Sequence, residues 1–285
     1  MLRFALGFCA TLVLFAATVC VAGEPLLRPN DTLALVGGTF VERLQSTAAL
    51  ESELQCRRPE WKLRVRNLGW SGDDVHGFAR KVFETDPQHG FERLINDLRI
   101  AKPSVAIVAY GFTESTGGAA AADAFEPGLR KLVKALADMQ CRVILVPPLK
   151  VPGVRVEAYA AQLQKCIAAV DRVGQETGSA VVEIHCQQWT DDGLAPSASG
   201  YDSIGEQLAT ALVGGQPCKA ADRELDQMII EKNRLFFHRH RPQNETYLML
   251  FRKHEQGNNA SELPEFDPLI DALDQQIWGR AAKLQ

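Results

Sequence analysis

Four short loops of the sequence, each after a predicted strand, are rich in glycine and in side chains with hydroxyl or carboxylate groups. The loops cover residues 37–39, 69–74, 111–115 and 190–195. In an open sheet of parallel strands, ligands bind beyond the carboxyl ends of the strands, so these four loops are expected to share one edge of a sheet. Thr39 in the first loop is a candidate nucleophile, provided that a neighbouring base removes its proton.

Strands and helices that alternate along the chain must position these loops. Strands are predicted over residues 32–36, 62–67, 104–109, 142–146 and 180–184, and the continuous apolar run of the third is typical of a strand buried on both faces. Helices are predicted over residues 41–54, 90–101, 125–139, 155–177 and 199–213, the last with Ser199 as its cap. This alternation predicts a doubly wound, mostly parallel sheet with right-handed crossovers.

The order and placement of the four loops resemble the SGNH, or GDSL-type, hydrolases, a family of esterases and deacetylases with a flavodoxin-like α/β fold. The resemblance covers roughly residues 31–213. It implies a three-layer sandwich around a mostly parallel five-stranded sheet. The predicted hydrolase-like domain spans residues 24–215, and residues 216–285 are predicted to form a C-terminal helical extension that packs on it.

The first two sequence blocks of the family correspond to the first two loops. The family's Gly-Asp-Ser turn carries the nucleophile, and here it reads Gly37-Gly38-Thr39. The resemblance therefore places Thr39 at the nucleophile position and Gly38 beside it as an oxyanion or substrate contact. The second block contributes a glycine whose backbone N–H joins the oxyanion hole, and Gly72 matches that glycine.

The third and fourth blocks depart from the family pattern. The family's Gly-x-Asn motif becomes Gly111-Phe112-Thr113, so Thr113 stands where an asparagine completes the oxyanion hole. The family's Asp-x-x-His motif begins at Asp192 and ends at Ala195, which replaces the histidine base. Losing one oxyanion donor costs about a hundredfold to a thousandfold in rate, and alanine has no atom that accepts a proton.

Two functions follow from these substitutions, and they leave open whether the chain is an enzyme. The first is a hydrolase-like protein whose site is impaired or rebuilt and which binds a carbohydrate or ester-type ligand. The second is an active esterase or deacetylase that acts on O-acyl ester bonds with a relocated base. His76, His185 and His240 are the candidates for that base, although each also fits a surface or structural histidine.

The C-terminal extension contains helical segments over residues 223–237 and 266–284, separated by a polar stretch that begins at residue 238. If that stretch is extended, His238 and His240 share one face and the two arginines share the other. Arg239 and Arg241 are then candidates for binding an anion or a sugar. The alternatives are a solvated linker between helices and a docking element for a protein partner. The sequence contains no metal-binding motif and no phosphate loop, so neither a metal nor another cofactor is predicted.

The first 23 residues match a secretory signal peptide: a basic start, an apolar stretch, and small residues before Glu24. A membrane anchor is the alternative, but cleavage would leave no transmembrane span, and the protein is predicted to be secreted or periplasmic. Five cysteines then remain, and they are predicted either to form one or two disulfides or to stay as buried thiols. The formal net charge of −4 and the 23% of charged residues do not favour nucleic acid as a partner.

Overall fold

The computed structural model describes residues 24–86, 88–218 and 221–284, so the predicted signal peptide lies outside the described residues. Five strands form one sheet in the order β2-β1-β3-β4-β5, and all four pairings between neighbouring strands are parallel. The strands are β1 (Thr32–Gly37), β2 (Arg64–Asn67), β3 (Val105–Ala109), β4 (Arg142–Leu145) and β5 (Ala180–Val181). The predicted parallel five-stranded α/β fold is confirmed.

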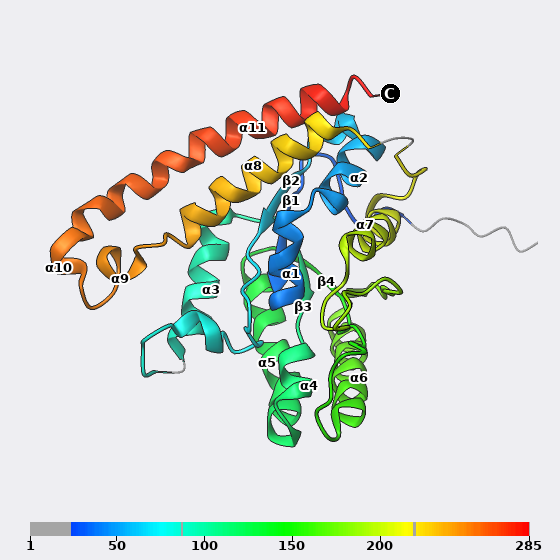
Figure 1. Ribbon diagram of the computed structural model, residues 1–285, viewed down its shortest axis with the longest axis vertical. Coiled ribbons are helices and arrows are strands. Elements are labelled where there is room, and N and C mark those ends of the chain that lie inside the picture. The colour runs from blue at the N-terminus through cyan, green and yellow to red at the C-terminus, as the bar shows by residue number, and fades with distance from the viewer. Residues whose placement is uncertain (1–23, 87, 219–220, 285) are drawn as a thin grey trace, which may run out of the picture.

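Helices cover both faces of the sheet, which gives three layers (Figure 1). Alternate residues of a strand point to opposite faces, and in β1 Ala34 and Val36 face one core while Leu33 and Leu35 face the other. The first core includes α3 (Gln88–Ala101), α5 (Ala119–Asp138) and α6 (Tyr159–Thr177). The second includes α1 (Thr39–Arg43), α2 (Ala49–Arg57) and α7 (Ala198–Val213).

The observed helices differ from the predicted ones mainly at their ends and at short 3₁₀ turns. The helix predicted over residues 41–54 is divided into α1 and α2 by a 3₁₀ turn, Leu44–Ser46. Ser46 and Thr47 donate side-chain hydrogen bonds back to the carbonyls of Arg43 and Leu44, and such bonds compete with the helical ladder. Ser197, rather than Ser199, caps α7 by accepting the Gly200 N–H. The remaining short elements are α4 (Phe112–Thr116) and the 3₁₀ turns Pro59–Trp61 and Phe78–Lys81.

The C-terminal residues form α8 (Arg223–His240), α9 (Glu245–Leu248), α10 (Lys253–Gln256), a 3₁₀ segment (Gly257–Glu265) and α11 (Phe266–Ala281). The helices α8 and α11 lie side by side across the end of the molecule where β2 lies (Figure 1). The predicted end of the helix at Phe237 is wrong, because α8 continues into the polar stretch as far as His240. On a helix His238 and His240 point to nearly opposite sides, so they do not share a face.

Buried ion pairs and one indole hydrogen bond attach this extension to the sheet domain. Lys232 of α8 is fully buried and pairs with Glu51 of α2, while Arg66 of β2 pairs with Asp274 of α11. The Trp278 Nε1 atom donates to the Leu63 carbonyl oxygen at 2.9 Å. Removing one partner of a buried pair leaves an uncompensated charge, so these contacts fix the extension in place. Within the described residues, no helix is long and apolar enough to cross a membrane.

Candidate functional site

The structure brings the first three predicted loops together around Thr39. This threonine is the first residue of α1, directly after the turn that ends β1. Its Oγ1 atom accepts a hydrogen bond of 2.9 Å from the Gly72 N–H. A Cβ atom built on Gly38 would lie 3.1 Å from the Asp73 carbonyl oxygen and 3.8 Å from Thr113 Oγ1. Gly38, Thr39, Gly72 and Thr113 therefore lie close together.

The loop that carries Gly72 packs closely on the start of α1. The Trp70 N–H donates to the Gly37 carbonyl oxygen at 2.9 Å, and Asn67 Nδ2 donates to the Val41 carbonyl oxygen at 2.7 Å. A side chain at Gly69 would lie 2.4 Å from the Glu42 backbone nitrogen. Only glycine permits this close approach between the loop and the helix. Gly69 therefore allows the loop that carries Gly72 to lie close to Thr39.

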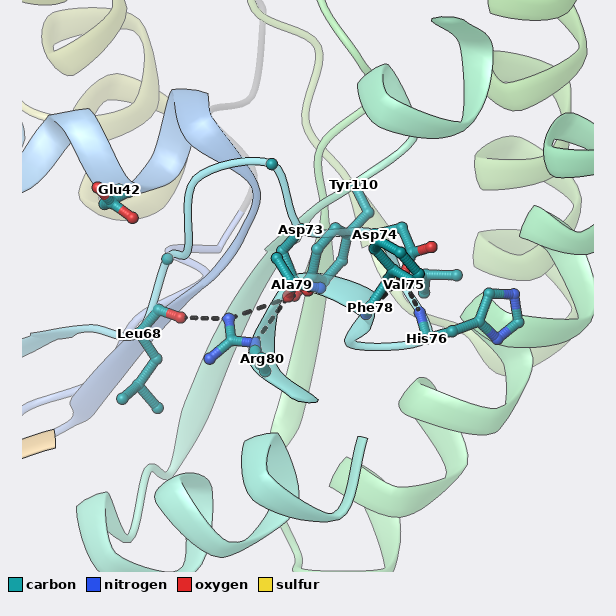
Figure 2. Close-up of polar contacts among 12 residues, drawn as sticks. Glu42, Leu68, Asp73, Asp74, Val75, His76, Phe78, Ala79, Arg80 and Tyr110 are labelled. Carbon is teal, nitrogen blue, oxygen red and sulfur yellow. Dashed lines mark hydrogen bonds and ion pairs between the residues drawn. The ribbon is translucent and has the colours of Figure 1, made fainter. Parts of the chain in front are cut away.

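A buried charged network supports the same loop from below (Figure 2). Asp73 Oδ2 accepts hydrogen bonds from Arg80 Nε at 2.7 Å and from the Tyr110 hydroxyl at 2.9 Å. Arg80 also donates to the Leu68 carbonyl oxygen at 2.6 Å. Burial raises the pKa of the Asp73 carboxyl, and Arg80 opposes this rise. The network ties the two ends of the loop to the end of β3.

Glu114 joins the second loop to the third. Its two carboxyl oxygens accept the Val75 N–H at 2.8 Å and the Gly111 N–H at 2.9 Å. Burial raises the pKa of Glu114 to about 7. The neighbouring Thr113 hydroxyl donates to the Asp73 carbonyl oxygen at 2.8 Å. The Thr113 hydroxyl proton, which could otherwise donate to an oxyanion, is therefore already hydrogen-bonded within the protein.

A cavity of about 140 Å³ opens beside Thr39. Its walls are mainly apolar and aromatic, and they include Phe40, Phe112, Leu149, Trp189, Leu194 and Ala195. Tyr201 also lines it, and the Tyr201 hydroxyl is buried without a hydrogen-bond partner among the described residues. Arg43 is exposed at its rim. Across the described chain, no histidine, aspartate or glutamate lines this cavity.

Asp192 lies near the cavity, but its carboxylate accepts hydrogen bonds from residues of its own turn. The Oδ1 atom accepts a hydrogen bond of 2.6 Å from the Thr190 hydroxyl and one of 2.9 Å from the Leu194 N–H. The Thr190 bond, followed by the Leu194 bond, lowers the pKa of this exposed carboxyl. With Ala195 in the cavity wall, Asp192 has no imidazole to orient at that position.

The three candidate bases lie elsewhere. His76 Nε2 is 3.2 Å from the Ala124 carbonyl oxygen on α5, and its ring extends away from α1 (Figure 2). His185 is exposed, and its backbone exchanges hydrogen bonds with Gln207. His240 is buried, with Nδ1 3.2 Å from Asp97 Oδ1. None of these histidines lines the cavity, so the structure gives no support to a relocated histidine base.

The two arginines proposed as ligand contacts are both engaged by the protein itself. Arg239 Nε lies 3.0 Å from Asp267 Oδ1 on α11. Arg241 Nη1 lies 2.6 Å from Glu42 Oε2, and its guanidinium stacks over Trp70. Because α8 is helical as far as His240, Arg239 and Arg241 do not form the shared anion-binding edge that an extended segment would have provided.

No protein-family model and no curated protein sequence matches the chain. Solved structures do match it. A catalytic mutant of Axe2, an acetylxylan esterase from Geobacillus stearothermophilus, has a TM-score of 0.53 and 18% identity, covering 66% of this chain and 96% of that one. LAE5, an alpha/beta hydrolase enzyme from the metagenome of Lake Arreo, has a TM-score of 0.53 and 20% identity, covering 66% and 98%. A lipase/acylhydrolase from Enterococcus faecalis has a TM-score of 0.50 and 18% identity, covering 67% and 100%.

These matches identify the class of fold to which the chain belongs. The sheet domain has the α/β fold of SGNH-type esterases and acylhydrolases, as the sequence resemblance implied. At this level of identity the likeness establishes the fold alone, since one fold supports many chemistries.

Proposed function

We propose that this chain is a hydrolase-fold binding protein that captures a ligand bearing an ester or acyl group beside Thr39 without hydrolysing it. The observation that carries the proposal is the composition of the cavity: Ala195 occupies the wall, and no imidazole or carboxylate lines it within the described residues. A hydroxyl nucleophile needs a base within hydrogen-bond reach. Among the described residues no base is hydrogen-bonded to Thr39, whose hydroxyl instead accepts the Gly72 N–H.

The size and walls of the cavity define the part of the ligand that fits. A dry apolar cavity of about 150 Å³ accommodates benzene, so a cavity of about 140 Å³ suits one ring or a short acyl chain. The Gly72 N–H can donate to a ligand carbonyl if that oxygen replaces Thr39 Oγ1 as its acceptor. The acetylxylan esterase among the structural matches supports an O-acylated carbohydrate as the ligand class.

The proposed site of action is outside the cytoplasm, and it rests on the signal-peptide pattern of residues 1–23. Fractionation of cells that express the full chain, with mass analysis of its N-terminus, tests this proposal. Recovery of uncleaved chain in the cytoplasm alone would contradict it, while a secreted product that begins near Glu24 would support it.

Calorimetry and a turnover assay together test the binding proposal. The unaltered protein should bind acetylated xylo-oligosaccharides more tightly than the deacetylated sugars and should leave aryl acetates intact. Turnover that Thr39→Ala abolishes would refute the absence of catalysis. Equal affinity for acetylated and deacetylated sugars would refute recognition of the acyl group.

A designed gain of function examines whether the missing base explains the lack of turnover. The double variant Thr39→Ser with Ala195→His restores a serine and an imidazole at the two positions that the family uses. Thr39→Ser alone is the matched control, because it supplies the better nucleophile without a base. We expect aryl acetate hydrolysis only from the double variant.

A further inference from the structure

Three arginines surround Trp70, which lies two residues before Gly72. The guanidinium carbons of Arg241, Arg93 and Arg80 lie 3.7, 4.6 and 5.3 Å from the centre of a Trp70 ring. Arg80 belongs to the buried network beneath the loop, and Arg93 lies on α3. Arg241 alone comes from the C-terminal extension, directly after the end of α8. The extension therefore contacts the loop that carries the proposed carbonyl-binding N–H.

A second contact leads from Arg241 to the residue next to Gly72. Glu42 Oε2 accepts hydrogen bonds from Arg241 Nη1 at 2.6 Å and from the Ser71 N–H at 2.5 Å. Glu42 is in the same short helix as Thr39. One carboxylate oxygen thus links the extension, the nucleophile helix and the backbone immediately before Gly72.

The turn at Gly72 has little other support from its own side chains. Gly72 has a φ of +72°, and a Cβ atom there would find nothing within 4 Å. Ser71 and Gly72 are both exposed. Their orientation must therefore come from backbone hydrogen bonds, and the Ser71 bond ends on the carboxylate that Arg241 holds.

Arg241 is itself held firmly. Its N–H donates to the Phe237 carbonyl oxygen at 2.7 Å, and its guanidinium lies 4.9 Å from the Phe237 ring centre. The preceding helix is anchored by the buried pair of Lys232 and Glu51. The position of Arg241 is thus set by packing that does not involve the cavity.

We propose that Arg241 is a positioning residue: through Glu42 and Trp70, the C-terminal extension holds the Ser71–Gly72 backbone so that the Gly72 N–H points at the ligand site. The consequence for ligand affinity rests on the proposed function. The orientation of the Gly72 N–H in the free protein is independent of the proposed function, and it can be tested without any ligand.

Amide hydrogen exchange and backbone NMR of the full chain test the orientation directly. In Arg241→Ala we expect the Ser71 and Gly72 amide shifts to move and their exchange to accelerate about tenfold, because a stacked cation and a charge-assisted bond are both lost. Arg239→Ala is the matched control, since this neighbouring arginine pairs with Asp267 instead. Arg241→Lys should give an intermediate result, because an ammonium keeps the charge but loses the planar stack.

Ligand binding separates failure of this inference from failure of the proposed function. If Arg241→Ala moves the two amides and weakens binding of the acetylated sugar about tenfold, both stand. If the unaltered protein binds no acylated ligand but the amides still move, only the proposed function fails. Unchanged Ser71 and Gly72 amides in a folded Arg241→Ala protein would overturn the positioning role.

A second variant keeps the inference testable if Arg241→Ala does not fold. Glu42→Gln keeps the shape of the side chain but removes the charge that binds Arg241. It should shift the same two amides while the melting temperature stays close to that of the unaltered protein. A folded Glu42→Gln protein with unchanged amides would also overturn the role.

Discussion

The Glu114 carboxyl should make the folded state less stable as the pH rises from about 5 to about 7. Burial raises its pKa from 4.5 to about 7, so in this window the folded chain holds a proton that the unfolded chain has released. When a carboxyl has a higher pKa in the folded chain than in the unfolded chain, its contribution to stability is fully present at a pH below the unfolded-state pKa. That contribution is lost as the pH rises through the folded-state pKa. At about 1.4 kcal/mol per pKa unit, the full shift is worth about 3.5 kcal/mol, and about 2 kcal/mol of it is lost between pH 5 and pH 7.

Urea unfolding of the natural chain and of Glu114→Gln, at pH 5 and pH 7.5, isolates this contribution. Glutamine can accept only one of the two N–H groups that Glu114 accepts, from Val75 and Gly111, but that cost does not depend on pH. The stability advantage of the natural chain over the variant should therefore shrink by about 2 kcal/mol between the two pH values.

The surface residue Glu126 provides the control for that experiment. Its hydrogen bond with Arg172 is the main cause that lowers its pKa, so its contribution changes only at more acidic pH. The gap between Glu126→Gln and the natural chain should stay constant from pH 5 to pH 7.5. If the Glu114→Gln gap is also constant, or widens with pH, the two backbone N–H groups stabilise the carboxylate more than burial penalises it, and the reasoning fails.

Three further predictions concern single positions. Gly72→Ala meets no atom but must adopt a φ of +72°, so it should cost about 1 kcal/mol and lower the melting temperature by about 2 °C. Ala195→Leu should fill the cavity and abolish ligand binding in calorimetry while the protein stays folded; unaltered affinity would place the ligand elsewhere. The thiols of Cys56 and Cys218 are free and line the same pocket, and the neighbouring Cys218 thiol lowers the pKa of Cys56. Oxidised glutathione should therefore link the two cysteines by thiol–disulfide exchange. Peptide mass analysis should detect the link in the natural chain and should not detect it in Cys218→Ser.

The sheet could be predicted because its signals are local. The central strand β3 is a continuous apolar run between Pro103 and a glycine loop, and burial on both faces requires such a run. The break between α1 and α2 could not be predicted from spacing, because the apolar pattern continues through it. Side-chain bonds from Ser46 and Thr47 to the preceding carbonyls end the first helix there.

The shared position of Thr39, Gly72 and Thr113 followed from the family pattern, but the groups that support them did not. Asp73 and Glu114 look like ordinary loop carboxylates in the sequence, and their burial arises only from packing against distant segments. Arg241 was predicted to face a ligand as part of an extended edge. Its true partners, Glu42 and Trp70, are far away in the sequence, so no local pattern indicates them.

The polar groups at the candidate site satisfy one another in a way that favours binding over catalysis. A catalytic oxyanion hole works because its donors are already aimed at the developing charge and need no reorganisation. Here the Gly72 N–H donates to Thr39 Oγ1, and the Thr113 hydroxyl donates to the Asp73 carbonyl oxygen. A reacting carbonyl would have to break both bonds to gain two donors, whereas a ligand that is held mainly by the apolar walls and takes only the Gly72 N–H breaks one of them. Restoring serine and histidine therefore supplies a nucleophile and its base but leaves the Thr113 donor engaged, so Thr113→Asn should raise the turnover of the double variant further.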